Sequence, residues 1–241
     1  MPSLPVDLRR EAGRSIPAFI AVPVLILAMW GAGVLIVHSR IDAWDLRQNM
    51  WLVEHRTAWL NRTTEWTTQL AETIPVLVIL LIAMVAARRW THGWRTTVFL
   101  ALAVGGEKLI YFVSSLLVRR DRPPVPPLGS TYATSSFPSG HVGSAITLYG
   151  AIALAVGAWL GRKYLVALIS VMVAFTLIVA FSRMYRGFHY PSDCIAGALV
   201  GGVWLTIALR VMSPLSESHR ASPAIVEPIS GADGMPASAI S

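Results

Sequence analysis

The chain has 241 residues, 54% of them hydrophobic and only 14% charged, which excludes an ordinary soluble globular domain and predicts a polytopic membrane protein. The net charge of +7 is spread over the termini and short loops. That distribution suits contact with anionic membrane lipids and argues against a nucleic-acid partner. The single cysteine, Cys194, excludes an intramolecular disulfide and a thiolate metal cluster.

Six apolar runs predict an all-α integral membrane bundle of six transmembrane helices. They lie at about 16–37, 74–87, 96–118, 138–160, 164–181 and 194–212. The second run reaches spanning length only if Thr68 to Glu72 form its polar end. We therefore predict a cytoplasmic tail at 1–15, a membrane domain at 16–212, and a disordered tail, rich in Ser, Pro, Ala and Gly, at 213–241.

The connection between the first two runs, residues 39–70, is long and polar. It carries tryptophans at spacings of seven, eight and seven residues, and these fall on one helical face. The four are Trp44, Trp51, Trp59 and Trp66. Two interpretations fit equally well: a helix lying in the headgroup layer, or a stripe packed against the rest of the protein.

The third run carries Glu107 and Lys108 at mid-depth. Neighbours in sequence do not face each other on a helix, so each side chain needs another partner. Charges inside a membrane are functional candidates. The two residues either fix the packing of helices or support catalysis.

Basic residues predict the orientation of the bundle. The amino-terminal segment, the loop at Arg88, the turn at Arg162 and the carboxyl tail are basic and alternate with the other connections. They are expected in the cytoplasm, which places residues 39–70, 119–140 and 182–193 on the extracytoplasmic face of the plasma membrane.

Two polar motifs meet on that outer face. Pro138-Ser139-Gly140-His141 opens the fourth run, and a segment from Ser182 to Asp193 precedes the sixth. The two histidines allow metal binding, a redox pair, or nucleophilic and acid–base catalysis. Because a dense field of guanidinium groups repels a cation and attracts phosphate, we predict a phosphate site with no metal and no cofactor.

Each side chain of this site has a predicted role in phosphoryl transfer. His189 attacks phosphorus, and Asp193, four residues further on at the first turn of the sixth helix, orients the imidazole. His141 protonates the leaving oxygen. The residues predicted to hold the phosphate are Arg122, Arg183 and, through backbone N–H groups, Ser139 and Gly140.

These motifs resemble those of the type 2 phosphatidic acid phosphatase superfamily of membrane lipid phosphatases. The family carries Lys, six residues, Arg-Pro; then Pro-Ser-Gly-His; then Ser-Arg, five residues, His, three residues, Asp. The second matches Pro138 to His141 and the third matches Ser182 to Asp193. Over about Glu107 to Met212, the resemblance implies metal-independent dephosphorylation of a lipid phosphate or diphosphate, such as a polyprenyl diphosphate, through a phosphohistidine on His189.

The first motif departs from the family pattern. Arg122-Pro123 is present, but Ser115 stands where the lysine is expected. Lys108 lies ~21 Å from Arg122 along a regular helix, so Arg119 or Arg120 is the predicted replacement cation. The departure leaves an alternative open, a non-enzymatic lipid-phosphate binder or transporter on the same scaffold. The related vanadium-dependent haloperoxidases are soluble, and six spans argue against that branch.

Overall fold

The computed structural model describes residues 6–92, 94–130 and 134–212, and every regular element within them is helical. The helices are α1 (Val6–Val37), α2 (Arg40–Glu54), α3 (Ala58–Gln69), α4 (Thr73–Thr91), α5 (Arg95–Val118), α6 (Gly140–Ser144), α7 (Gly150–Leu160), α8 (Arg162–Tyr185) and α9 (Pro191–Val211). A π-helical stretch, Ala145–Tyr149, joins α6 to α7. The predicted tail at 213–241 and the first five residues of the predicted amino-terminal tail lie outside the described residues.

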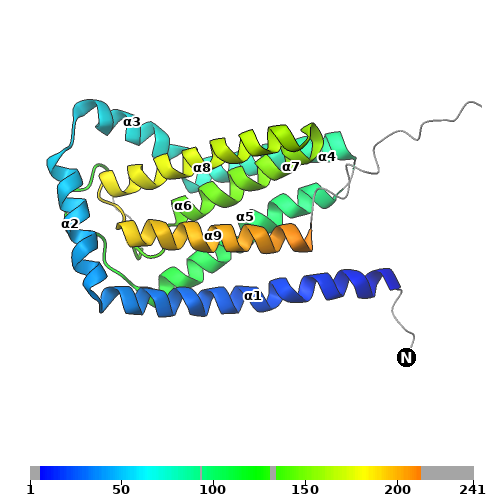
Figure 1. Cartoon of the computed structure of the whole chain (residues 1–241), viewed down its shortest axis with the longest axis horizontal. Coiled ribbons are helices and arrows are strands. Elements are labelled where there is room, and N and C mark those ends of the chain that lie inside the picture. Colours follow the sequence, from blue (N-terminus) through cyan, green and yellow to red (C-terminus); the bar gives the residue numbers. More distant parts are fainter. Residues whose placement is uncertain (1–5, 93, 131–133, 213–241) are drawn as a thin grey trace, which may run out of the picture.

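Six helical stretches are long and apolar enough to cross a membrane, which confirms the predicted fold class. They are Ala18–Val37, Thr73–Thr91, Arg95–Val118, Gly140–Leu160, Lys163–Tyr185 and Pro191–Val211. The spans run side by side as a bundle, and α2 lies across one end of it (Figure 1). Large apolar side chains such as Leu81 and Val171 are exposed on the bundle, as expected for a surface that faces lipid.

Several helices extend beyond the apolar runs that predicted them. Helix α4 continues past the second run to Thr91 and does not include Thr68 to Glu72, so the prediction that those residues lengthen the span is wrong. Helix α1 begins at Val6, inside the predicted tail. Helix α8 continues to Tyr185, so Ser182 and Arg183 lie in its last turn. Their polar groups are paired within the protein: Ser182 donates to the Thr64 carbonyl at 2.7 Å, and Arg183 donates to the Thr68 hydroxyl at 3.0 Å. These partners allow the helix to continue past the end of the apolar run.

The tryptophan segment forms two helices rather than one. The chain breaks after α2, and Thr57 starts α3 as its N-cap by accepting a hydrogen bond from Leu60 N–H. All four tryptophans are exposed, between 43% and 71%. The interpretation of a tryptophan stripe packed on the protein is therefore wrong. A different face of α2, with Asp45, Asn49 and Leu52, is the buried one.

Glycine allows α6 and α9 to approach closely. A Cβ atom on Gly197 would lie 2.4 Å from the Ser139 carbonyl oxygen, and one on Gly201 would lie 3.0 Å from that of Gly143. Gly202, by contrast, has nothing within 4 Å of such an atom. The close approach places the start of α6 against the start of α9, where both predicted motifs lie.

Candidate active site

The two predicted histidines meet at the end of the bundle that α2 covers. His141 lies in the first turn of α6, and His189 lies in the connection between α8 and α9. Their ring centroids are 6.4 Å apart. The structure thus brings together two motifs that are almost fifty residues apart in the sequence.

The imidazole of His189 is buried and held through its Nδ1 atom. Nδ1 lies 2.6 Å from the Ser136 carbonyl oxygen and 3.6 Å from Asp193 Oδ2. Because a carbonyl oxygen only accepts, Nδ1 carries the proton and Nε2 keeps its lone pair. Burial lowers the pKa of His189 to about 4; the nearby Asp193 opposes this shift, and the positive charge of Arg183 adds to it. The ring is therefore neutral at pH 7.

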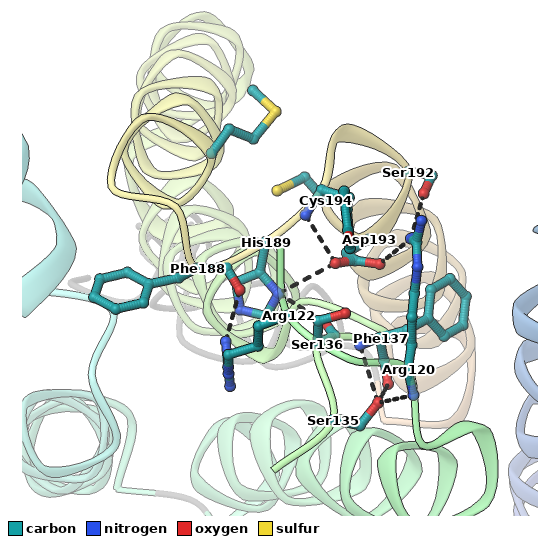
Figure 2. A network of polar contacts seen from close by, with 12 residues as sticks. Arg120, Arg122, Ser135, Ser136, Phe137, Phe188, His189, Ser192, Asp193 and Cys194 are labelled. Carbon is teal, nitrogen blue, oxygen red and sulfur yellow. Dashed lines mark hydrogen bonds and ion pairs between the residues drawn. The ribbon is translucent and has the colours of Figure 1, made fainter. Parts of the chain in front are cut away.

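Asp193 links His189 to a second cluster of charges. It is the third residue of α9 and fully buried, and its Oδ2 accepts from Tyr190 N–H at 2.9 Å. Its Oδ1 accepts from Arg120 at 2.6 Å. Figure 2 shows the carboxylate between the imidazole of His189 and the guanidinium of Arg120. The prediction that Asp193 lies in the first turn of the last helix is confirmed.

Arg120 binds carboxylates instead of filling the phosphate-binding role predicted for it. Its guanidinium donates to Asp42, Asp45 and Asp193 at 2.6–2.8 Å, and to the Ser192 hydroxyl at 2.8 Å. Burial alone would lower the pKa of Arg120, but the three carboxylates raise it above its ordinary value. Arg120 thus clamps α2 to the start of α9.

The other proposed replacement, Arg119, lies on the surface. It is exposed, and its Nε donates to the Leu116 carbonyl at 3.2 Å. Ser115, at the family's lysine position, is buried and donates to the Phe112 carbonyl at 2.8 Å. Both proposed replacement cations are thus engaged by other groups of the protein.

Arg183 and Arg122, the two arginines predicted to hold the phosphate, both lie near His189. Arg183 is buried, stacks its guanidinium 4.3 Å from the centre of the Phe188 ring, and lies 3.8 Å from Glu72. Arg122 donates to the Phe188 carbonyl at 2.7 Å and to Thr134 at 3.2 Å. Both contribute positive charge at His189, so the anion-attracting field expected from the sequence is present around this histidine.

Ser139 differs from its prediction in one respect. Its backbone N–H donates to the Asp193 carbonyl at 3.0 Å, so the group of Ser139 that a phosphate could use is the side-chain hydroxyl. Gly140 is the first residue of α6, where backbone N–H groups have no partner within a helix. It packs against Tyr111, which a Cβ atom would approach to 2.8 Å.

Glu72, to which the sequence alone assigned no role, contacts the second histidine. It is the N-cap residue of α4, and its Oε1 lies 3.1 Å from Nε2 of His141. Its only signal in the sequence is a carboxylate at the edge of an apolar run. Nothing in the spacing of the motifs connects it to His141.

Helix α2 contributes two further residues that sequence reasoning missed. Asp45 accepts from the backbone N–H and the hydroxyl of Ser192, and Asn49 donates to the carbonyl oxygens of His189, at 3.0 Å, and Met184, at 3.3 Å. Polar residues at 42, 45 and 49 recur with helical spacing, which is a readable signal for a buried polar face.

The charges at mid-depth share one partner. Lys108 donates to the Ser144 hydroxyl, which lies 3.4 Å from Glu107 Oε2 and donates to the Gly140 carbonyl at 2.6 Å. The expectation that each charge needs a partner other than its neighbour is confirmed, and that partner lies in the turn that follows His141. Within residues 6–92, 94–130 and 134–212, no three His, Cys, Asp or Glu side chains are arranged to hold a metal ion.

Known proteins resemble this chain in sequence. A profile of the PAP2 superfamily matches residues 96–216. Phosphatidylglycerophosphatase B of Bacillus subtilis (strain 168) is 29% identical over 153 residues, which cover 61% of this chain and 72% of that protein. Putative undecaprenyl-diphosphatase YbjG of Escherichia coli (strain K12) is 29% identical over 144 residues, covering 56% and 69%.

Solved structures share the fold. The transmembrane PAP2 type phosphatidylglycerolphosphate phosphatase from Bacillus subtilis superposes with a TM-score of 0.68 at 23% identity, covering 81% of this chain and 94% of that one. Aquifex aeolicus LpxE superposes with a TM-score of 0.55 at 19% identity, covering 68% and 94%.

Proposed function

Because the chain belongs to the PAP2 superfamily, we propose that it is a membrane phosphatase that removes phosphate from a lipid phosphate or diphosphate through a phosphohistidine on His189, without a metal. The observation that carries the proposal is the state of His189. Its Nδ1 proton is engaged by Ser136 and faces Asp193, so Nε2 is available as a neutral nucleophile beside two arginines.

The proposed reaction has two steps, transfer of the phosphoryl group to His189 and hydrolysis of the phosphohistidine. The lone pair of His189 Nε2 forms a bond to phosphorus, the bond from phosphorus to the lipid oxygen breaks, and His141 gives its proton to that oxygen. In the second step, neutral His141 takes a proton from water as the water oxygen attacks phosphorus. The P–N bond breaks, its electron pair returns to His189, and inorganic phosphate is released.

Each proposed phosphate ligand stabilises the charge that builds on the equatorial oxygens. Arg122 and Arg183 supply fixed positive charge, and the Gly140 N–H and the Ser139 hydroxyl supply neutral donors at the start of α6. We place this site on the extracytoplasmic face of the plasma membrane, because the basic connections at Arg88 and Arg162 are expected in the cytoplasm.

The names of the relatives define the substrates to test. Purified protein in detergent with chelator should release inorganic phosphate from phosphatidylglycerophosphate or undecaprenyl diphosphate, and vanadate should inhibit it. The variant His189→Ala should be inactive and form no acid-labile phosphoenzyme, whereas His55→Ala, at an exposed histidine, should keep its activity. Binding of lipid phosphate without turnover, unaffected by loss of His189, would instead indicate a binder or transporter.

A further inference from the structure

The proposed acid, His141, has a carboxylate partner that comes from a distant part of the chain. Glu72 stands at the start of α4, and its Oε1 lies 3.1 Å from His141 Nε2. The same oxygen lies 3.8 Å from an Arg183 nitrogen. The side chains of Glu72 and His141 are only 29% and 15% exposed, so water screens this contact weakly.

Several charged or titratable groups surround His141. Arg183 from α8 and His189 from the α8–α9 connection act on it electrostatically. From α5, Lys108 reaches Ser144, one turn further along the helix. Burial and a neighbouring cation disfavour the protonated form of this imidazole, and a contacting anion favours it. Glu72 is the anion in contact with His141, and an acid must be protonated before it can donate.

We propose that Glu72 is a positioning residue for the acid step: it orients His141 and favours its protonated form, and so determines which leaving groups the site can expel. The inference rests on the proposed function. The site then contains two carboxylate–histidine pairs with opposite tasks. Asp193 supports a nucleophile that must be unprotonated at Nε2, and Glu72 supports an acid that must carry a proton.

The two lipid substrate classes differ in their need for this proton. A lipid monophosphate expels an alkoxide, whose conjugate acid is about as weak as water, with a pKa near 15.7. A lipid diphosphate that loses its terminal phosphate expels a phosphate group, whose conjugate acid has a pKa of about 6. Protonation by His141 is therefore demanding for the monophosphate and nearly dispensable for the diphosphate.

The test compares polyprenyl monophosphate and polyprenyl diphosphate of the same chain length in one detergent. In Glu72→Gln, kcat for the monophosphate should fall by about 100-fold, within the usual range for general acid catalysis, and kcat for the diphosphate by less than about tenfold. Glu72→Asp keeps the carboxylate on a shorter side chain and should lie between Glu72→Gln and the wild type. Glu65→Gln removes the same charge from an exposed position on α3 and should leave both rates unchanged.

Three results would overturn the inference. Equal losses on both lipids in an active enzyme would mean that Glu72 has no role specific to proton donation. A lower KM at unchanged kcat would mean that it competes with phosphate for Arg183. If Glu72→Gln does not fold, an unchanged substrate ratio in folded Glu72→Asp, verified by its thermal unfolding, would equally rule out the positioning role. A wild-type protein inactive on both lipids would overturn the proposed function itself.

Discussion

Replacing Arg120 with methionine should destabilise the folded protein rather than weaken phosphate binding. The guanidinium is the partner of two fully buried carboxylates, Asp45 and Asp193, and of the half-exposed Asp42. Removing one partner of a buried ion pair costs about 3–5 kcal/mol, because the remaining charge is left uncompensated. Asp42 adds little, since water screens it. We expect a loss of about 4 kcal/mol.

Thermal unfolding in detergent, followed by tryptophan fluorescence, measures this loss. For a domain of this size, about 4 kcal/mol lowers Tm by about 8–16 °C. The matched control is Arg119→Met, an adjacent and exposed arginine, which should change the free energy of unfolding by less than about 0.5 kcal/mol. Adding Asp45→Asn to Arg120→Met should restore part of the stability, because it removes one of the buried charges left without a partner.

Two results would refute this reasoning. If Arg120 holds phosphate, Arg120→Met should lose affinity for vanadate while Tm stays at the wild-type value. If the carboxylates are not its partners, Asp45→Asn should add its own destabilisation to that of Arg120→Met instead of reducing it.

Three other changes test the remaining contacts of the site. Gly197→Ala should cost about 1–3 kcal/mol by overpacking, because its Cβ atom would meet the Ser139 carbonyl, whereas Gly202→Ala should not destabilise the protein; equal effects on Tm would contradict the close approach of α6 and α9. The pKa of His189 is lowered to about 4 in the folded protein, so between about pH 6.5 and 4 the unfolded chain binds more protons than the folded one. The free energy of unfolding should therefore decrease by about 3 kcal/mol as pH falls through that window. Chemical denaturation at each pH measures this slope, which should be flatter in His189→Gln. Asn49→Ala removes a donor from the His189 carbonyl and should lower stability by about 1–2 kcal/mol, with reduced kcat; an unchanged phosphate-release rate would show that this bond does not position the nucleophile.

The sequence predicted those parts of the molecule that follow from local pattern. Hydropathy located six spans, because a span must be apolar along its whole length. Motif spacing placed His189 four residues before Asp193, and a proline at the helix start fixed their relation. Such features need no knowledge of how the helices pack.

Contacts between distant segments were not predictable in the same way. Arg120 was predicted to bind phosphate because its positive charge attracts an anion. The anions that it contacts are set by the position of α2, which brings Asp42 and Asp45 to it. Glu72 contacts His141 only because the end of α3 turns into α4 beside α6. The helical spacing of Asp45 and Asn49 indicates a buried polar face on α2. The sequence interpretation considered only the face that carries the tryptophans.

The cover formed by α2 and the start of α4 has an evolutionary consequence. Residues 96–216 match the family profile and carry both histidines. Asn49 and Glu72 precede that region, and they contact His189 and His141 from outside it. The proposed reacting groups and the residues that contact their surroundings thus lie in separate stretches of the sequence. Under the proposed roles, substitutions within residues 40–72 can change the substrate preference while Pro138 to His141 and Ser182 to Asp193 stay unchanged.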